Sequence, residues 1–356
     1  MTDSPESGGT PPILEVDDLV VRFRGGGRVV RAVNSVSFSV HVGETIGIVG
    51  ESGSGKTVTM LAILGLLPSP PAEVLSGTAR LLGEDLLAAS QARLRELRGQ
   101  NVAMVFQDPM TSLNPVIKVG EQIREALWVH DRNGSKAEHM ARVVELLDLV
   151  GVPQPARRAA QYPHEFSGGM RQRAMIAMAI ANDPALLVAD EPTTALDVTI
   201  QAQVIDVLME AKRASGAATV LVTHDLGIVS EIADRVMVMY AGRIVEQGPT
   251  AGLFDQPRHP YTIGLLASLP SIDARRSRLY SIPGQPPNLA DLPSSGCPFR
   301  NRCAVGRTRT RCSTEQPELI PVEIGHTVAC HYLDDVAAWA KSDPFREDEP
   351  SSGAVP

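Results

Sequence analysis

Eight residues near the start of the chain have the spacing of a phosphate-binding loop. The stretch Gly50-Glu51-Ser52-Gly53-Ser54-Gly55-Lys56-Thr57 fits the pattern G-x-x-x-x-G-K-[ST] without a mismatch. Its glycines allow a tight turn, in which successive backbone N–H groups point at one centre and hold phosphate oxygens. Lys56 would place a positive charge on the outer phosphates, and the Thr57 hydroxyl would be a magnesium ligand. These residue types predict a nucleoside triphosphate site.

The segments on either side of the loop are those that such a site requires. The apolar run at residues 45–49 predicts a buried strand before the loop, and residues 58–67 predict a helix after it. A chance glycine-rich turn is the alternative. The strand–loop–helix context favours a true phosphate loop over that alternative.

Two acidic residues and a histidine follow later apolar runs. Residues 186–189 predict a parallel strand covered on both faces, and this strand ends in Asp190 and Glu191. Asp190 can hold a water on magnesium, whereas Glu191, one residue on, points elsewhere and can orient an attacking water. His224 follows the strand predicted at residues 220–223. The alternative is that these polar residues only end their strands.

Composition and charge exclude several classes of protein. The chain has 356 residues, of which 43% are hydrophobic, enough for one large domain and a smaller one. Its formal charge of −8 argues against a nucleic-acid partner held by phosphate contacts. No apolar run approaches the roughly 20 residues that span a bilayer, and residues 1–12 lack the apolar core of a signal peptide. We therefore expect a cytoplasmic protein whose membrane attachment, if any, goes through a partner.

Several motifs together resemble those of the ABC transporter ATPases. Residues 166–172 resemble the family signature LSGGQ, with Met170 in place of the usual glutamine. Residues 185–191 resemble the Walker B strand, and residues 194–197 resemble the D-loop. Gln107 and His224 stand where the family has its Q-loop and H-loop. The motifs occur in the family's order between about residues 13 and 250.

The resemblance implies an α/β fold with a RecA-like P-loop ATPase core, an antiparallel β subdomain and a helical subdomain. The strands predicted at residues 14–23, 29–40 and 76–82 would form the antiparallel part, and the helices predicted between 119 and 160 would lie in the helical subdomain at about 110–180. Residues 1–12 would be a disordered leader, 13–250 the ATPase domain, 251–339 a small cysteine-bearing extension, and 340–356 a disordered tail.

The resemblance also assigns roles to residues. Glu191, His224 and Lys56 would be catalytic, and magnesium would be held by Thr57, by Gln107, and by Asp190 through water. Phe23 would stack on adenine, and Thr59 would join the loop, Gln107, Asp190 and His224 in binding ATP. The signature residues Ser167, Gly168, Gly169 and Met170, with Asp197 of the D-loop, would face ATP held by a second ATPase subunit.

Two stretches indicate a subfamily. The first resembles the Q-loop extension of ATPases that drive dipeptide and oligopeptide import, and it reads Asp108-Pro109-Met110-Thr111-Ser112-Leu113-Asn114-Pro115. The second, His259-Pro260-Tyr261-Thr262, is similar to an element in the C-terminal extension of peptide- and nickel-importing ATPases. The resemblance implies an ATP-hydrolysing subunit that drives import of dipeptides and oligopeptides. It would work at the cytoplasmic face of the membrane with a second, similar ATPase, two permeases and an extracytoplasmic peptide-binding protein.

Three alternatives to peptide import stay open. Nickel import uses the same architecture. A non-transport ABC ATPase of the repair type is disfavoured, because the stretch between Lys56 and Asp190 leaves no room for a coiled-coil or zinc insertion. A degenerate regulator is disfavoured by the presence of Lys56, Glu191 and His224 together.

The four cysteines of the chain all lie in the predicted extension. Cys297, Cys303, Cys312 and Cys330 favour a metal site over disulfides in a reducing compartment. Their spacing matches none of the common zinc or ferredoxin patterns. The extension resembles family members whose four cysteines hold a [4Fe–4S] cluster, which implies such a cluster in a mainly structural role. Structural zinc and unligated buried cysteines are the alternatives, with His326 and His331 as possible ligands.

Overall fold

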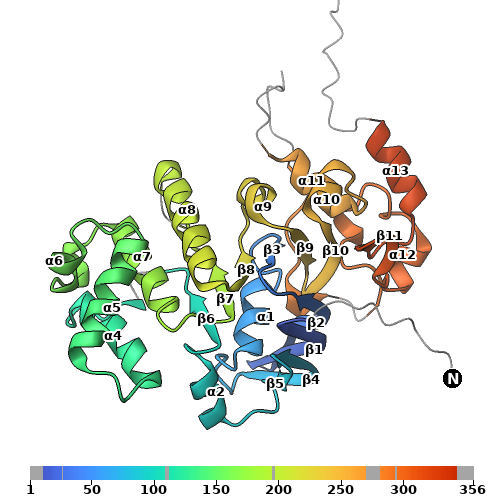
Figure 1. Ribbon diagram of the computed structural model, residues 1–356. Helices are drawn as coiled ribbons and strands as arrows, with labels where there is room; N and C mark the ends of the chain where they lie inside the picture. The colour runs from blue at the N-terminus through green and yellow to red at the C-terminus, as the bar shows by residue number, and fades with distance from the viewer. Residues whose placement is uncertain are drawn as a thin grey trace, which may run out of the picture.

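Two β-sheets form the frame of the protein (Figure 1). The computed structural model describes residues 11–25, 27–108, 112–194, 197–269, 281–292 and 295–342. Most of the predicted leader and tail lie outside these residues. Helix α13 (Leu333–Lys341) nevertheless extends into the first residues of the predicted tail.

The larger sheet has the strand order β11-β12-β10-β9-β3-β8-β7-β6. Neighbouring strands from β9 to β6 run parallel, whereas β10, β12 and β11 are added antiparallel at one side. The strands are β3 (Thr45–Val49), β6 (Val102–Val105), β7 (Leu186–Asp190), β8 (Ala218–Val222), β9 (Arg235–Tyr240), β10 (Arg243–Pro249), β11 (Ile320–Glu323) and β12 (His326–Val328).

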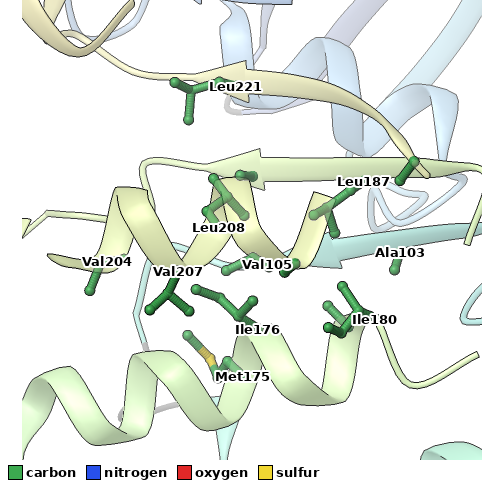
Figure 2. Close-up of a cluster of buried hydrophobic side chains, with 14 of the residues drawn as sticks. Ala103, Val105, Met175, Ile176, Ile180, Leu187, Val204, Val207, Leu208 and Leu221 are labelled. Atoms are coloured by element: carbon green, nitrogen blue, oxygen red, sulfur yellow. The ribbon is translucent and has the colours of Figure 1, made fainter. Parts of the chain in front are cut away.

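Both faces of the parallel part are buried, which explains its continuous apolar runs. In β7, Leu186 and Val188 face a core shared with helix α1, whereas Leu187 and Ala189 face a second core. Figure 2 shows this second core, in which side chains of α7 and α8 lie against the strands that carry Ala103, Leu187 and Leu221. Full burial of such a leucine or valine contributes roughly 1.5–3 kcal/mol.

The smaller sheet is antiparallel and has the order β2-β1-β4-β5. It covers the α1 side of the larger sheet through residues such as Leu14, Val16 and Phe38. Its first two strands confirm the predicted alternation, although Gly26 of the expected turn lies outside the described residues. The strands are β1 (Leu14–Gly25), β2 (Arg28–Val40), β4 (Ala72–Leu81) and β5 (Glu84–Asp85).

Four of the described helices lie in the predicted helical subdomain, drawn in green in Figure 1. Ser135 and Glu138 make a capping box that starts α5 just after the expected break at Asn133 and Gly134. Apolar residues such as Ile123, Leu146 and Ile176 then join the second core. The elements are α4 (Val119–His130), α5 (Lys136–Leu149), α6 (Pro155–Ala159), the 3-10 turn η1 (Pro163–Glu165) and α7 (Gly168–Ala179).

The C-terminal part of the chain is joined to the larger sheet by strand pairing, because β12 pairs with β10. None of the described helices is both long and apolar enough to span a membrane. The remaining elements are α1 (Lys56–Ile63), α2 (Gln91–Leu97), α8 (Val198–Ser215), α9 (Leu226–Ile232), α10 (Thr250–Asp255), α11 (Pro260–Ala267), η2 (Leu289–Asp291), η3 (Arg300–Arg302) and α12 (Thr310–Thr314).

Candidate nucleotide-binding site

A cavity of about 670 Å³ lies at the carboxyl ends of the parallel strands. This is the edge at which open α/β sheets bind ligands. The phosphate loop follows β3, and loops after β6, β7 and β8 bring in the other predicted residues. A volume of this size suits a small-molecule ligand. The lining consists of residues 51–58, Gln107, Glu191, His224 and Pro286.

Two glycines of the phosphate loop are required by its geometry. Gly50 has φ +151°, and a side chain there would collide with the carbonyl oxygen of Met239. Gly55 has φ +104°, and a Cβ there would lie 2.5 Å from the carbonyl oxygen of Ala32. Only glycine fits both demands. Lys56 follows this turn as the first residue of α1. The helix therefore begins two residues earlier than predicted.

Lys56 is held inside the loop that precedes it. Its Nζ donates to the carbonyl oxygen of Gly50 at 2.7 Å and to that of Glu51 at 3.2 Å. Burial lowers the pKa of the Lys56 amine, and the nearby Glu191 and Asp190 carboxyls oppose that change. The amine therefore lies at the base of the cavity, close to the loop N–H groups that would hold phosphate oxygens.

Thr57 and Asp190 meet although 133 residues separate them in the sequence. The Thr57 hydroxyl donates to Oδ1 of Asp190 at 2.8 Å. Burial raises the pKa of the Asp190 carboxyl, while the hydrogen bond from Thr57 lowers it in part. Hydroxyl and carboxylate oxygens are ligands that Mg²⁺ prefers, so the donor set of this pair fits that ion.

Glu191 is surrounded by polar groups from three strand ends. Its Oε2 accepts hydrogen bonds from Gln107 Nε2 at 3.1 Å and from Thr194 Oγ1 at 2.9 Å. Its Oε1 lies 3.5 Å from Nδ1 of His224, whose side chain is largely exposed. The backbone of Glu191 has φ +45°, a strained conformation of the kind found at functional sites. The structure therefore brings the predicted general base, Q-loop and H-loop residues together.

Other predicted site residues lie outside the cavity lining. Phe23 is half-buried against the core of the smaller sheet, and Thr59 is fully buried with its hydroxyl donating to the Gly55 carbonyl oxygen. Asp197 caps α8 by accepting from the Ile200 N–H at 3.0 Å. The rest of the D-loop, Ala195 and Leu196, lies outside the described residues. The signature residues Ser167, Gly168, Gly169 and Met170 form the start of α7.

Comparisons with known proteins show the family to which this chain belongs. Residues 33–194 match the family model described as ABC transporter, and residues 245–312 match the one described as oligopeptide/dipeptide transporter, C-terminal region. A putative peptide import ATP-binding protein of Brucella ovis is 50% identical over 338 residues, which are 92% of this chain and 99% of the relative. The chain belongs to the ABC transporter family.

Further relatives and solved structures agree with this assignment. The oligopeptide transport ATP-binding protein OppD of Haemophilus influenzae is 49% identical over 87% of this chain and 93% of its own length. OppD of Mycobacterium tuberculosis is 50% identical over 94% of this chain, and the match spans only 54% of that relative's length. A similar solved structure is that of the dimeric ATP-binding cassette MJ0796 in a post-hydrolysis state, bound to ADP and Pi. The match covers 67% of this chain and 98% of that chain, with a TM-score of 0.60 and 25% sequence identity.

In this ABC protein the C-terminal extension contacts the phosphate loop. The sequence analysis did not predict this contact. Tyr261 accepts a hydrogen bond from the Glu51 N–H at 2.8 Å. Arg302 donates to both carboxylate oxygens of Glu51, at 2.6 and 2.9 Å. Pro286 contributes to the wall of the cavity itself. No short-range sequence signal places residues 210 and 251 positions away against the loop.

The His-Pro-Tyr element of the ABC extension is anchored by a buried carboxyl group. Glu246 of β10 is fully buried and accepts from the backbone N–H groups of Arg258 and His259 and from Nε2 of His326. His259 in turn caps α11 by accepting the Tyr261 N–H at its Nδ1. Burial lowers the pKa of His259 to about 4. The network fixes Tyr261 beneath the phosphate loop.

The four cysteines are free thiols that border one small cavity of about 20 Å³. Burial raises the pKa of Cys297 to about 12 and that of Cys330 to about 11. Among the described residues, no three His, Cys, Asp or Glu side chains are arranged as the ligands of a metal ion. The thiols are therefore gathered but not positioned as a preformed metal site. His326 is engaged by Glu246, and His331 contacts the Glu315 carbonyl oxygen.

Proposed function

We propose that this chain is the ATP-hydrolysing subunit of an ABC importer of dipeptides and oligopeptides. The observation that carries the proposal is the cavity at which Lys56, Gln107, Glu191 and His224 converge. The match of residues 245–312 to the C-terminal region of oligopeptide and dipeptide transporters supports the substrate class.

In the proposed reaction, the protein positions ATP and a water and offsets the charge that develops on the phosphates. Loop N–H groups and the Lys56 ammonium would bind the β- and γ-phosphates. The Glu191 carboxylate would orient the attacking water and accept its proton. Gln107 and Thr194 donate to Glu191 and hold its Oε2 in place. His224 would contact the γ-phosphate from the end of β8.

Thr57 and Asp190 would hold magnesium, with Asp190 acting through a water and Gln107 completing the ligand set. Bound there, the ion would neutralise charge on the β- and γ-phosphates. The hydrogen bond between Thr57 and Asp190 supports this assignment, because it places two hard oxygen donors together beside Lys56.

A second ATPase subunit would complete the site. Ser167 caps α7 by accepting from the Met170 N–H, and the N-terminus of this helix carries a partial positive charge that suits a phosphate. Because Ser167 to Met170 lie outside the cavity of their own chain, we propose that they and Asp197 face the nucleotide of a homologous partner.

Two permeases would dock beside the helical subdomain, and an extracytoplasmic peptide-binding protein would deliver substrate to them. An apolar groove of about 560 Å³ supports this placement. It lies between β6 and the helices α4 and α7, and it includes Phe106, Met104, Met175 and Met178. Phe106 is 42% exposed and directly precedes Gln107, so a partner in this groove would contact the residue next to the catalytic site. The subunit would then be peripheral at the cytoplasmic face of the membrane.

Uptake measurements test the substrate class. Cells lacking this gene would receive the wild-type gene or Glu191→Gln, and uptake of a labelled tripeptide and of radioactive nickel would be measured. Restoration of peptide uptake by the wild type alone supports the proposal. Restoration of nickel uptake alone would favour the nickel importer, and ATP hydrolysis without either uptake would favour a non-transport ATPase.

We also propose that Cys297, Cys303, Cys312 and Cys330 hold one [4Fe–4S] cluster with a structural role. Four thiols around one cavity form a donor set that fits a soft metal centre. A cavity of about 20 Å³ is smaller than a cluster, so the thiols would have to move outward on binding. They would also have to lose their protons, which burial now retains. Structural zinc is the alternative that the same donors allow.

Metal analysis of the purified protein distinguishes the iron–sulfur cluster from the zinc site. Protein purified anaerobically should be brown, should bleach with dithionite, and should contain about four irons per chain. Stoichiometric zinc in colourless protein would replace the cluster by a zinc site. Absence of both metals from protein that folds and binds ATP would leave the cysteines as ordinary core residues.

A further inference from the structure

Two residues of the extension contact the phosphate loop at Glu51. Its carboxylate pairs with both terminal nitrogens of Arg302, and its N–H donates to the Tyr261 hydroxyl. Its carbonyl oxygen accepts from Lys56 within the loop. The Ser54 N–H donates to the same carbonyl oxygen at 3.2 Å. All the polar groups of Glu51 are therefore engaged, and two of its four partners, Tyr261 and Arg302, come from the extension.

Arg302 is built into the protein as a rigid donor. Its side chain is 6% exposed, and its Nε donates to the Pro283 carbonyl oxygen at 3.0 Å. Its guanidinium lies over the rings of Tyr240 and Phe299, at 5.8 and 6.0 Å from their centroids. Because these contacts already hold the guanidinium in place, it can form two parallel hydrogen bonds to the Glu51 carboxylate with little further loss of side-chain entropy.

The position of this pair matters for an anionic ligand. Glu51 lines the cavity next to the loop N–H groups, so an unpaired carboxylate there would repel the phosphates of ATP. Arg302 neutralises that charge and fixes the backbone from which the loop turns. Pro286, three residues beyond the Pro283 carbonyl that Arg302 binds, also lines the cavity.

We propose that Arg302 is a positioning residue for ATP binding, acting through Glu51, and that the extension is thereby part of the nucleotide site. The inference rests on the proposed function, since it assumes that the cavity binds ATP. It adds that residues beyond the ATPase core set the affinity of the phosphate loop.

Equilibrium titration of the full chain with a fluorescent ATP analogue tests the proposal. Arg302→Gln should weaken binding about 10-fold, in line with the coupling energies of contacting charged residues. Arg300→Gln is the matched control, because Arg300 lies in the same turn but its Nε donates to the Asn301 side chain and not to Glu51. It should bind as the wild type does. Thermal unfolding would establish that each variant is folded.

A double substitution separates positioning from general loss of structure. In Glu51→Gln/Arg302→Gln the repelling carboxylate is gone, so affinity should recover by several-fold relative to Arg302→Gln. A purely structural role would predict no recovery. Arg302→Lys keeps the charge without the bidentate fork and should fall between the wild type and Arg302→Gln.

Three outcomes would overturn the inference. They are wild-type affinity in folded Arg302→Gln, equal weakening in Arg300→Gln, and a double variant no better than the single one. If Arg302→Gln fails to fold, wild-type affinity in Arg302→Lys would overturn it instead. A wild-type chain that binds no ATP would refute the proposed function itself, which keeps the two failures distinct.

Discussion

Gln107 Nε2 donates a hydrogen bond to Glu191 Oε2 at 3.1 Å, and this contact joins the ends of β6 and β7 across 84 residues of sequence. Gln107 directly follows Phe106 of the apolar groove, so one residue separates the proposed permease surface from the proposed general base. A shift of the β6 end would therefore move a hydrogen-bond donor of Glu191.

Replacement of Glu191 by glutamine should preserve ATP binding and abolish most turnover. A positioned general base contributes roughly 10²–10⁴-fold to rate, and glutamine keeps the size of the side chain without accepting a proton. Steady-state ATPase activity of the assembled transporter is the measurement, with nucleotide affinity as the control. Unchanged turnover would mean that the hydrolysing site belongs to the partner.

Lys56→Ala should weaken nucleotide binding itself. The substitution removes the ammonium group that now donates to the Gly50 and Glu51 carbonyl oxygens beneath the cavity. A hydrogen bond to a charged group is worth about 1.5–3 kcal/mol, so affinity should fall roughly 10- to 100-fold. Titration with a non-hydrolysable ATP analogue measures this, and unaltered affinity would remove Lys56 from the site.

Met170→Gln should leave the ATP affinity of the isolated chain unchanged, because Met170 lies at the start of α7 and outside the cavity. In the assembled transporter it should raise turnover at the partner's site by restoring a hydrogen-bonding side chain. Hydrolysis measured in a Glu191→Gln background isolates that site. A changed affinity in the isolated chain would contradict the arrangement in which the signature faces the partner.

Stability should fall as the pH drops below 6.5, through His259. The pKa of His259 is lowered from 6.5 to about 4 by burial, which Glu246 only partly opposes. The unfolded chain therefore binds a proton between these values and the folded chain does not, so unfolding is favoured as pH falls. The loss amounts to roughly 2 kcal/mol between pH 7 and pH 5.

Thermal unfolding of His259→Asn measures that contribution. Asparagine retains an N-cap acceptor for the Tyr261 N–H and does not titrate. The variant should lose less stability than the wild type between pH 7 and pH 5. His41→Asn, at an exposed position, is the control and should follow the wild type. Equal pH dependence in all three proteins would show that His259 contributes nothing.

The positions of the proposed catalytic residues were predictable because their sequence signals are local. The loop at residues 50–57 and the strand end at Asp190 and Glu191 each carry their chemistry within one element and the turn that follows it. Parallel strands then bring those turns to one edge of the sheet, so the meeting of Thr57 with Asp190 follows from fold class alone. The strand and helix positions follow similarly from periodicity.

The contribution of the extension was not predictable in this way. Arg302 is one arginine among many in the sequence, and its pairing with Glu51 depends on the course of the chain from β10 to η3. The hairpin of β11 and β12 is short, and its outer strand includes the exposed Ile320, so neither alternation nor length marked it. Both the Arg302–Glu51 ion pair and the hairpin of β11 and β12 depend on contacts between residues far apart in the sequence.

The antiparallel addition of β12 to β10 has a practical consequence for anyone who shortens this chain. A boundary placed at residue 250 matches the end of the motif-bearing region, yet it would strip the neighbour from β10 and leave that strand with unpaired N–H and C=O groups. It would also remove the three groups that donate to the buried Glu246 carboxyl, namely the Arg258 and His259 N–H groups and Nε2 of His326. A fragment cut there should be prone to aggregate through the bare strand.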